Sequence, residues 1–175
     1  MWRQRIRRLG ALLGLTILGS AWLWFDQPNV TRSASGDVIV IRDGDTLSIA
    51  GLDHRLHGID APEYRQTCQR AEGADWECGK EARAALAAVT KGKTLTCEEL
   101  ARDKYHRVVA RCLDGQGRDV AQVMVQQGMS ISLDGFIEGP YADDAQAAKE
   151  DKRGIWQGRF VEPAIWRETH EEAPR

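Results

Sequence analysis

The sequence predicts an α+β domain, a small Greek-key β-barrel of five short strands with about three helices. Two observations lead to this fold class. Short segments rich in Val, Ile, Leu and Thr, bounded by turn-forming residues, recur between residues 37 and 133, and segments of helical composition separate them. Residues 37–166 are also long enough to form one domain with its own hydrophobic core.

The first 27 residues are predicted to be a signal peptide or a membrane anchor. Residues 1–8 contain four arginines and precede an almost uncharged apolar run over residues 9–25, which is the pattern of an export signal. Small residues at 19–21 would permit cleavage and release a secreted protein. The bulky aromatic residues at 22–25 are instead typical of a membrane interface, so we favour an uncleaved hydrophobic anchor helix.

The arginines would orient an anchored protein. Positively charged residues stay on the cytoplasmic side of a membrane, so the rest of the chain is expected to face the periplasm or the exterior. Residues 28–36, which are rich in Thr, Ser, Arg and Gly, have the composition of a linker. Residues 167–175 contain three glutamates and are expected to form an acidic, disordered tail.

The charge balance excludes a general binder of nucleic acid. The chain contains 24 Lys and Arg and 26 Asp and Glu, and residues 1–27 hold four of the arginines and one of the aspartates. The remainder therefore has 20 basic and 25 acidic side chains. Because non-specific affinity for nucleic acid depends on basic side chains that neutralise phosphates, any such contact is expected to be local and assisted by a metal ion.

The first three strands are predicted near the start of the domain. Residues 37–42 open the sheet, and residues 46–49 and 54–57 pair as a hairpin. The Gly and Asp between these two segments favour a turn. Paired residues in a hairpin have a constant sum of residue numbers, so a turn centred between positions 52 and 53 would place Asp45 opposite Asp60.

The proximity of Asp45 and Asp60 predicts a metal site. Two neighbouring carboxylates repel unless a cation offsets their charge, and oxygen ligands suit a hard ion such as Ca²⁺. Glu63 adds a third carboxylate, and the guanidinium of Arg55 has the shape that binds a phosphate through two hydrogen bonds. Each acidic residue alone is most often a solvated turn residue, but their convergence around Arg55 favours a site for a metal and a phosphate.

Two disulfides are predicted from the four cysteines, Cys68, Cys78, Cys97 and Cys112. No Cys-x-x-Cys pair occurs, which disfavours a zinc site. Residues 95–98 and 108–112 are predicted to be antiparallel strands, and a turn centred between positions 104 and 105 places Cys97 opposite Cys112, within reach of a disulfide. Cys68 and Cys78 would form the second bridge. Both bridges fit an oxidising compartment, and four buried free thiols are the alternative.

Three helices and a last strand complete the domain. Residues 80–89 are rich in Ala, and residues 119–127 begin with Asp119 as a helix cap. Residues 141–153 form the third predicted helix. Residues 129–133 are expected to be the last strand.

Five short sequence patterns resemble the thermonuclease family, whose domains are called staphylococcal-nuclease-like. Each pattern is weak alone, but their order and spacing over residues 37–156 are specific. They are Asp-Gly-Asp-Thr at residues 43–46, Arg-Leu at 55–56 followed by Asp-Ala-Pro-Glu at 60–63, Asp-Lys-Tyr-His-Arg at 103–107, Gln-Gly at 127–128 and Gly-Ile-Trp at 154–156.

The resemblance implies an OB-type five-stranded barrel with three helices and a calcium-dependent nuclease activity on DNA or RNA. It implies that Asp45 and Asp60 bind Ca²⁺ together with the backbone carbonyl of Ala61. The family often has Thr where this chain has Ala61. Because that ligand is a main-chain oxygen, we expect the change to be tolerated.

The resemblance also implies catalytic and substrate-binding roles. Glu63 would be the general base, and Arg55 and Arg107 would clamp the phosphate. Lys104 and Tyr105 are the next candidates, for contacts with phosphate charge and with a sugar or base.

Two segments depart from the family pattern. The loop between Cys68 and Cys78 follows the site directly, and the stretch after Gly128 lacks the tyrosines that flank the base in the family. Phe136 and Tyr141 are the candidates to replace them as stacking surfaces.

Two other function classes remain open. One is a catalytically inactive OB-fold module that binds nucleic acid or protein while tethered to the membrane, and the other is a structural domain that binds a partner at the membrane. Retention of the two arginines and Glu63 together with both aspartates favours the nuclease. We expect the protein to be a monomer.

Overall fold

The computed structural model describes residues 30–32, 39–133 and 139–170. The predicted anchor over residues 9–25, most of the predicted linker and residues 171–175 of the predicted tail lie outside the described residues. Within the described ranges, no helix combines the length and the apolar character needed to cross a membrane.

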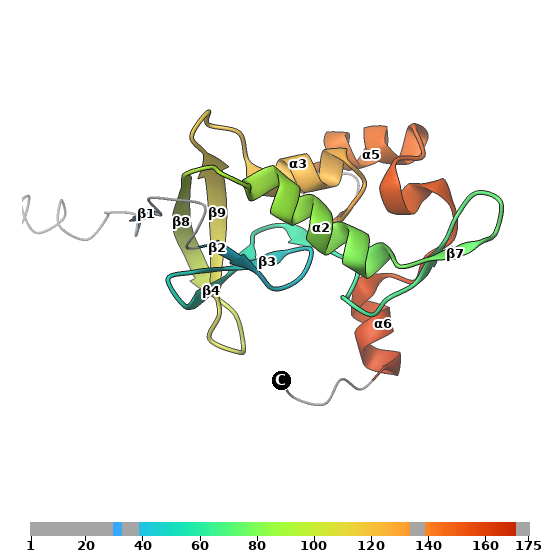
Figure 1. Ribbon diagram of the computed structural model, residues 1–175, viewed down its shortest axis with the longest axis horizontal. Coiled ribbons are helices and arrows are strands. Elements are labelled where there is room, and N and C mark those ends of the chain that lie inside the picture. Colours follow the sequence, from blue (N-terminus) through green and yellow to red (C-terminus); the bar gives the residue numbers. More distant parts are fainter. Residues whose placement is uncertain (1–29, 33–38, 134–138, 171–175) are drawn as a thin grey trace, which may run out of the picture.

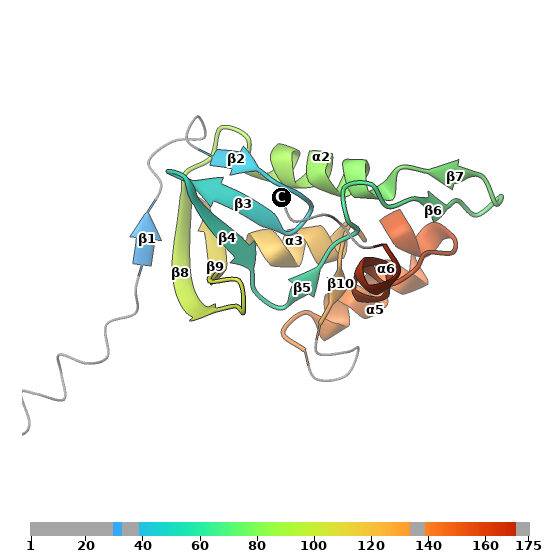
Figure 2. The same ribbon diagram turned by 90° about the horizontal axis from the view of Figure 1, so that it is seen from below.

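Six strands form the main sheet, in the order β1-β8-β9-β4-β3-β2 (Figure 1, Figure 2). Neighbouring strands are antiparallel except for β4 and β9, which run parallel. The strands are β1 (Val30–Arg32), β2 (Ile39–Ile41), β3 (Thr46–Ile49), β4 (Leu52–Leu56), β8 (Leu95–Arg102) and β9 (Val108–Asp114).

The main sheet is open. Five of its strands run in the order β2-β3-β4-β9-β8, and within the described residues no pairing joins β8 back to β2. The outer edge of β8 pairs with β1 instead, from Thr96 to Glu98. The prediction of a closed five-stranded barrel is therefore wrong. β1 pairs with the edge of β8 that β2 would have to reach to close the barrel.

Two short ladders lie outside the main sheet. β5 (Ile59–Asp60) pairs with β10 (Ile131–Ser132), and β6 (Cys68–Gln69) pairs with β7 (Asp75–Trp76). The strand predicted at residues 129–133 is thus shorter and pairs with β5 rather than with the main sheet. Both views place β1 and β8 at one end of the long axis and the β6–β7 hairpin at the other (Figure 1, Figure 2).

Helices cover one side of the sheet and extend past it. They are α2 (Cys78–Thr90), α3 (Val120–Gln126), α5 (Ala142–Glu150), the 3-10 turn η2 (Gly154–Gln157) and α6 (Pro163–Thr169). The side chain of Asp119 accepts a hydrogen bond from the Ala121 backbone N–H at 3.0 Å, which confirms the predicted cap of α3. α6 continues past residue 166, so the first residues of the predicted tail are helical.

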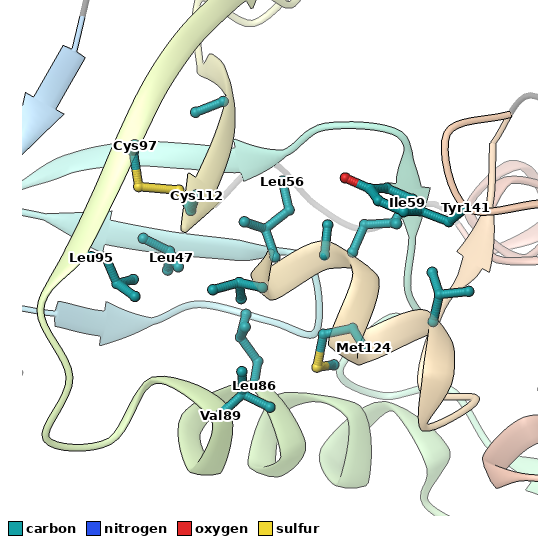
Figure 3. Packing of buried hydrophobic residues seen from close by; sticks show 14 of the residues in the cluster. Leu47, Leu56, Ile59, Leu86, Val89, Leu95, Cys97, Cys112, Met124 and Tyr141 are labelled. Atoms are coloured by element: carbon teal, nitrogen blue, oxygen red, sulfur yellow. A yellow bond between two sulfur atoms is a disulfide. The ribbon is translucent and has the colours of Figure 1, made fainter. Parts of the chain in front are cut away.

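The main core lies between the sheet, α2 and α3. Leu86 of α2, Met124 of α3 and Leu47 of β3 are fully buried and point into the same interior (Figure 3). These apolar side chains fix how the two helices sit on the sheet.

Both predicted disulfides are present. Cys97 lies directly opposite Cys112 on β8 and β9, with a Cα–Cα distance of 4.0 Å. Cys68 is bonded to Cys78, which is the first residue of α2. The register on which the first bridge was predicted holds from Leu95 to Glu99, and an irregularity between Glu99 and Ala101 then shifts it by one residue.

The β3–β4 turn differs from the prediction. Ala50 and Gly51 both have positive φ angles, 51° and 83°, and Ile49 pairs with Leu52. A two-residue turn of this kind matches the twist of the flanking strands better than a longer loop. The turn centre therefore lies two residues before the predicted position, and Asp45 is level with Leu56, whose N–H donates to the Asp45 carbonyl at 2.8 Å.

Burial predicts which leucines determine stability. Leu86→Ala is expected to lower the free energy of unfolding by about 2–5 kcal/mol, because it leaves a cavity between α2, α3 and the sheet. Leu100→Ala changes the same atoms at a site that is 45% exposed and should cost no more than about 0.5 kcal/mol. Urea unfolding measures both values, and equal losses would contradict this assignment of the core.

Candidate active site

Five parts of the chain bring acidic and basic side chains together. Asp45 lies just before β3, Arg55 lies on β4 and Asp60 ends β5. Glu63 follows in the next loop, and Arg167 comes from α6. We call these five residues the carboxylate cluster. It contains three carboxylates and two guanidinium groups, so it has one negative charge in excess.

Arg55 connects the two aspartates. Its two terminal amino groups are 2.8 Å from Asp45 Oδ2 and 2.7 Å from Asp60 Oδ1. Burial lowers the pKa of Arg55, but the charges of the two aspartates outweigh burial, and the net pKa is raised. The guanidinium therefore stays protonated and holds β3, β4 and β5 together at one point.

Asp45 is buried at the centre of the cluster. Its Oδ1 accepts a hydrogen bond from the Thr46 hydroxyl at 2.8 Å, and its Oδ2 accepts one from the Ala61 N–H at 3.4 Å. Burial raises the pKa of Asp45 well above its ordinary value, and Asp43 and Asp60 raise it further against the opposing effect of Arg55. The buried site is therefore short of positive charge.

Arg167 contacts two of the carboxylates. Its NH1 group is 3.0 Å from Asp60 Oδ1 and 2.7 Å from Glu63 Oε1, and its NH2 group is 2.9 Å from Asp60 Oδ2. Burial lowers the pKa of Arg167, but hydrogen bonds and charge from Asp60 and Glu63 give a net rise. Both oxygens of the fully buried Asp60 thus accept hydrogen bonds from guanidinium groups.

The loop that carries Glu63 is fixed from both sides. The Glu63 backbone N–H donates to the side-chain carbonyl oxygen of buried Gln66 at 3.1 Å. On the other side, Gly79 at the start of α2 lies so close that a Cβ there would be 1.7 Å from the Glu63 carbonyl oxygen. Only glycine allows this approach, so the start of α2 sets the position of Glu63.

Arg107 lies at the turn between β8 and β9. Asp103 accepts hydrogen bonds there from the backbone N–H groups of Tyr105 and Arg107, at 2.8 and 2.9 Å, and from Arg107 Nε at 2.7 Å. Burial raises the pKa of Asp103, but the hydrogen bonds from Arg107 and the Tyr105 N–H give a net decrease. Asp103 therefore stays ionised and fixes both the turn and the arginine.

Arg55 and Arg107 belong to the same face of neighbouring strands. Arg55 is level with Val109 across the parallel β4–β9 pair. Because side chains alternate along a strand and Val108 and Ala110 are buried, Arg107 and Val109 point to the face that carries Arg55. Arg55 and Arg107 do not contact each other directly, but they lie on neighbouring strands of one face.

Lys104 and Tyr105 form the tip of the same turn. The ring of Tyr105 is 66% exposed, with the Lys104 ammonium 5.1 Å and the Arg107 guanidinium 5.5 Å from its centre. This combination of an exposed aromatic ring and two cations suits single-stranded nucleic acid, whose bases stack and whose phosphates are anionic.

The donor atoms fit calcium in kind. Asp45 and Asp60 offer carboxylate oxygens, Ala61 offers a carbonyl, and the raised pKa of Asp45 marks a place where added positive charge would be stabilising. Within the described residues, no group of three or more Asp, Glu, His or Cys side chains is arranged to hold a metal ion. Arg55 and Arg167 instead donate hydrogen bonds to oxygens of the three carboxylates. These two guanidinium groups therefore balance most of the negative charge of the cluster.

Comparison with known proteins identifies the family. A family model described as "Staphylococcal nuclease homologue" matches residues 53–158, more than half of the chain. The chain belongs to the staphylococcal nuclease family. The matched segment contains Arg55, Asp60, Glu63 and Arg107, whereas Asp45 lies before it and Arg167 after it.

Several curated proteins are similar in sequence to this chain. The succinoglycan biosynthesis protein ExoI of Rhizobium meliloti (strain 1021) is 36% identical over 154 residues, which cover 87% of this chain and 77% of the relative. An uncharacterized endonuclease of Escherichia coli is 29% identical over 149 residues, covering 82% and 91%. The probable endonuclease LCL3 of Schizophyllum commune (strain H4-8 / FGSC 9210) is 30% identical over 138 residues, covering 68% and 46%.

Sequence reasoning missed two residues at the site and misplaced another. Arg167 lies 104 residues from Glu63, inside a segment interpreted as a disordered tail, and Gln66 belongs to no recognisable motif. The usable signal for α6 was Pro163, since proline is favoured in the first turn of a helix. Tyr141 is buried and its hydroxyl donates to Asp119 at 3.0 Å, so it is not a stacking surface, and Phe136 lies outside the described residues.

Removal of the Asp45 charge should stabilise the metal-free protein at neutral pH. Since folding raises the pKa of Asp45, the native state binds more protons than the unfolded chain between the unfolded and folded pKa values, and stability falls as pH rises through that window. Asp45→Asn has no proton to lose there. Urea unfolding in chelator is expected to show a gain of the order of 1 kcal/mol at pH 8, and a smaller gain toward pH 4.

Asp143→Asn is the control, because Asp143 is an exposed residue of α5 outside the carboxylate cluster. A gain for Asp45→Asn that is the same at both pH values would contradict the raised pKa.

Proposed function

We propose that this protein is a calcium-dependent nuclease that hydrolyses phosphodiester bonds of DNA, RNA or both with low sequence specificity. Family membership and relatives named as endonucleases support a nuclease-type hydrolase. The observation that carries the proposal is Arg55, whose guanidinium joins the buried Asp45 and Asp60 beside Glu63.

In the proposed reaction, Glu63 acts as the general base. It accepts a proton from the attacking water as the water oxygen forms a bond to phosphorus, and the bond from phosphorus to the leaving ester oxygen breaks. The contacts of Gln66 and Gly79 fix the position of the backbone from which the Glu63 carboxylate extends. Such positioning matters because water is a poor nucleophile without an aligned base.

Arg55 and Arg107 are proposed to hold the phosphate. Each guanidinium donates hydrogen bonds from a planar fork that matches two phosphate oxygens, where negative charge increases in the transition state. Asp103 holds Arg107 through Nε, which orients the fork.

The proposed metal ligands are Asp45, Asp60 and the backbone carbonyl of Ala61. A bound Ca²⁺ would polarise the phosphoryl oxygens. All three ligands are buried, which limits the movement that they need to hold the ion.

Lys104 and Tyr105 are proposed to bind the strand next to the cleaved bond. Stacking on a tyrosine ring accepts any base and contributes about 1–3 kcal/mol per base where it occurs. Contacts of this kind would give affinity without sequence specificity. They also suit an acidic domain, since they need only a local group of cations.

The site of action is proposed from the first 27 residues and the disulfides. A membrane anchor at residues 9–25 would place the domain in the periplasm or outside the cell as a monomer, and cleavage would release it. The two disulfides support an oxidising compartment. The alternative function is a membrane-tethered OB-fold binding module, which the exposed Tyr105 between two cations would also serve.

The test uses the full chain in detergent with its disulfides intact. Hydrolysis of denatured DNA and of RNA is measured with Ca²⁺ and with excess chelator, for the wild type and for Glu63→Gln. We expect activity only with Ca²⁺ and a loss of several orders of magnitude in kcat for the variant, because the amide cannot accept the proton. Glu72→Gln, in the exposed loop before β7, should retain full activity.

Three outcomes would count against parts of this proposal. Activity in excess chelator would reject the calcium requirement, and normal turnover by Glu63→Gln would remove Glu63 from its role. Binding of single strands by folded protein without any hydrolysis would support the binding module instead.

Arg107→Lys tests the phosphate clamp. Lysine keeps the charge but lacks the fork, so we expect kcat/KM to fall by about 100-fold or more, with the loss mainly in kcat. Steady-state kinetics on denatured DNA provide the measurement. The matched control is Arg102→Lys on β8, an exposed arginine of the same hairpin paired with Glu99, and losses of equal size in both variants would argue against a specific clamp.

A further inference from the structure

Arg167 enters the carboxylate cluster from outside the family segment. The family match ends at residue 158, and α6 begins at residue 163. From this helix, Arg167 donates to both oxygens of Asp60 and to one oxygen of Glu63, at distances between 2.7 and 3.0 Å. One guanidinium from α6 thus contacts both a proposed metal ligand and the proposed base.

The approach to α6 is built into the domain. Gln66 accepts from the Glu63 backbone N–H and donates through Nε2 to the Val161 carbonyl at 2.6 Å. Upstream of Val161, Gly158 lies so close to Gln69 that a Cβ there would be 2.1 Å from the Gln69 carbonyl oxygen. The buried side chain of Gln66 therefore links the loop that carries Glu63 to the segment that leads into α6.

Within α6, two buried residues place Arg167. Pro163 and Trp166 are buried, and the Trp166 ring stacks on His170 with ring centres 4.3 Å apart. The helix is therefore held against the domain by two buried side chains that precede the arginine in sequence. Its position beside Asp60 follows from this packing.

The two arginines differ in exposure. The Arg55 side chain is 17% exposed and is surrounded by β3, β4 and β5, whereas the Arg167 side chain is 40% exposed. The Asp60 side chain has no exposed surface. A cation that approaches Asp60 from solvent therefore meets Arg167, which can move outward while Arg55 remains in place.

We propose that Arg167 sets the divalent-cation affinity of this site, by neutralising Asp60 and Glu63 in the metal-free protein and competing with the cation for their oxygens. The inference rests on the proposed function, because it takes the site to bind Ca²⁺. Like charges disfavour each other strongly where solvent is excluded. Arg167 on α6 then raises the concentration of Ca²⁺ that is needed to occupy the site.

Calcium titration of the full chain, by calorimetry in detergent with intact disulfides, tests the competition. Arg167→Met keeps a side chain of similar length without the charge, and we expect its Kd for Ca²⁺ to fall by at least about tenfold. Arg167→Lys keeps a charge that cannot contact both carboxylates equally well, so its Kd should lie between the two. Arg159→Met removes an exposed arginine outside the carboxylate cluster and should leave the Kd unchanged.

Thermal unfolding supplies a second readout that does not depend on activity. In chelator, Arg167→Met should melt at a lower temperature than the wild type, because Asp60 loses one of its two cations. Added Ca²⁺ should then raise the melting temperature of this variant by more than that of the wild type. Far-UV circular dichroism establishes that each variant is folded before titration, and Arg167→Lys keeps the test available if Arg167→Met does not fold.

The results separate this inference from the proposed function. If the wild type binds Ca²⁺ and Arg167→Met binds it equally or more weakly, competition is overturned while the calcium-dependent nuclease stands. If the wild type and all variants fail to bind Ca²⁺, both the calcium requirement and the competition are overturned. If Arg167→Met binds Ca²⁺ more tightly than the wild type and Arg159→Met does not, the competition is supported.

Discussion

The ion pairs of Arg55 are the interaction on which the rest of the site depends. Asp45 and Asp60 are buried close together, and neither would keep its charge in the interior without a cation. Arg55 supplies that cation from β4, a central strand paired with β3 on one side and β9 on the other. The order of the sheet therefore does more than form a core, since it places Arg55 beside β3, which follows Asp45, and beside β9, which follows Arg107. Asp60 reaches the same guanidinium from β5, outside the main sheet.

The second half of the site depends on contacts between distant parts of the chain. Glu63 is placed by the start of α2 at Gly79, by Gln66 and by the disulfide that joins Cys68 to the first residue of α2. The same glutamine holds the segment that leads to α6 and Arg167. Loop, helix start and C-terminal helix are thus one connected unit, and a change at any of these contacts is expected to act on the orientation of the base.

Sequence reasoning located most strands and helices of the domain, but not β1, the β6–β7 hairpin or α6, and it did not give the exact geometry of the site. Residues 46–49 were predicted without error, and Cys97 was correctly placed opposite Cys112, because strand composition and a short turn determine local register. The hairpin register around Asp45 was wrong, since Ala50 and Gly51 form a tighter turn than composition indicates. Asp60 still reaches Asp45, because the chain turns again at Gly58, which has a φ of 75°, and Arg55 then draws the two carboxylates together. The open sheet and the contact of Arg167 could not be predicted, because both depend on pairing between segments far apart in sequence.

Arg167 illustrates how one contact can have opposite effects on stability and on ligand binding. In the metal-free protein, its hydrogen bonds to Asp60 and Glu63 satisfy carboxylates that would otherwise be buried with too little positive charge. Any ion that binds the same oxygens must first offset the loss of those hydrogen bonds, so the free energy that stabilises the resting protein is subtracted from the binding of the ion. Arg55 also occupies one oxygen of Asp45 and one of Asp60, but it is more buried than Arg167 and lies among three strands, so it is the less easily displaced of the two arginines. A helix that follows the matched family segment can therefore adjust the metal requirement of the site while the residues within that segment stay unchanged.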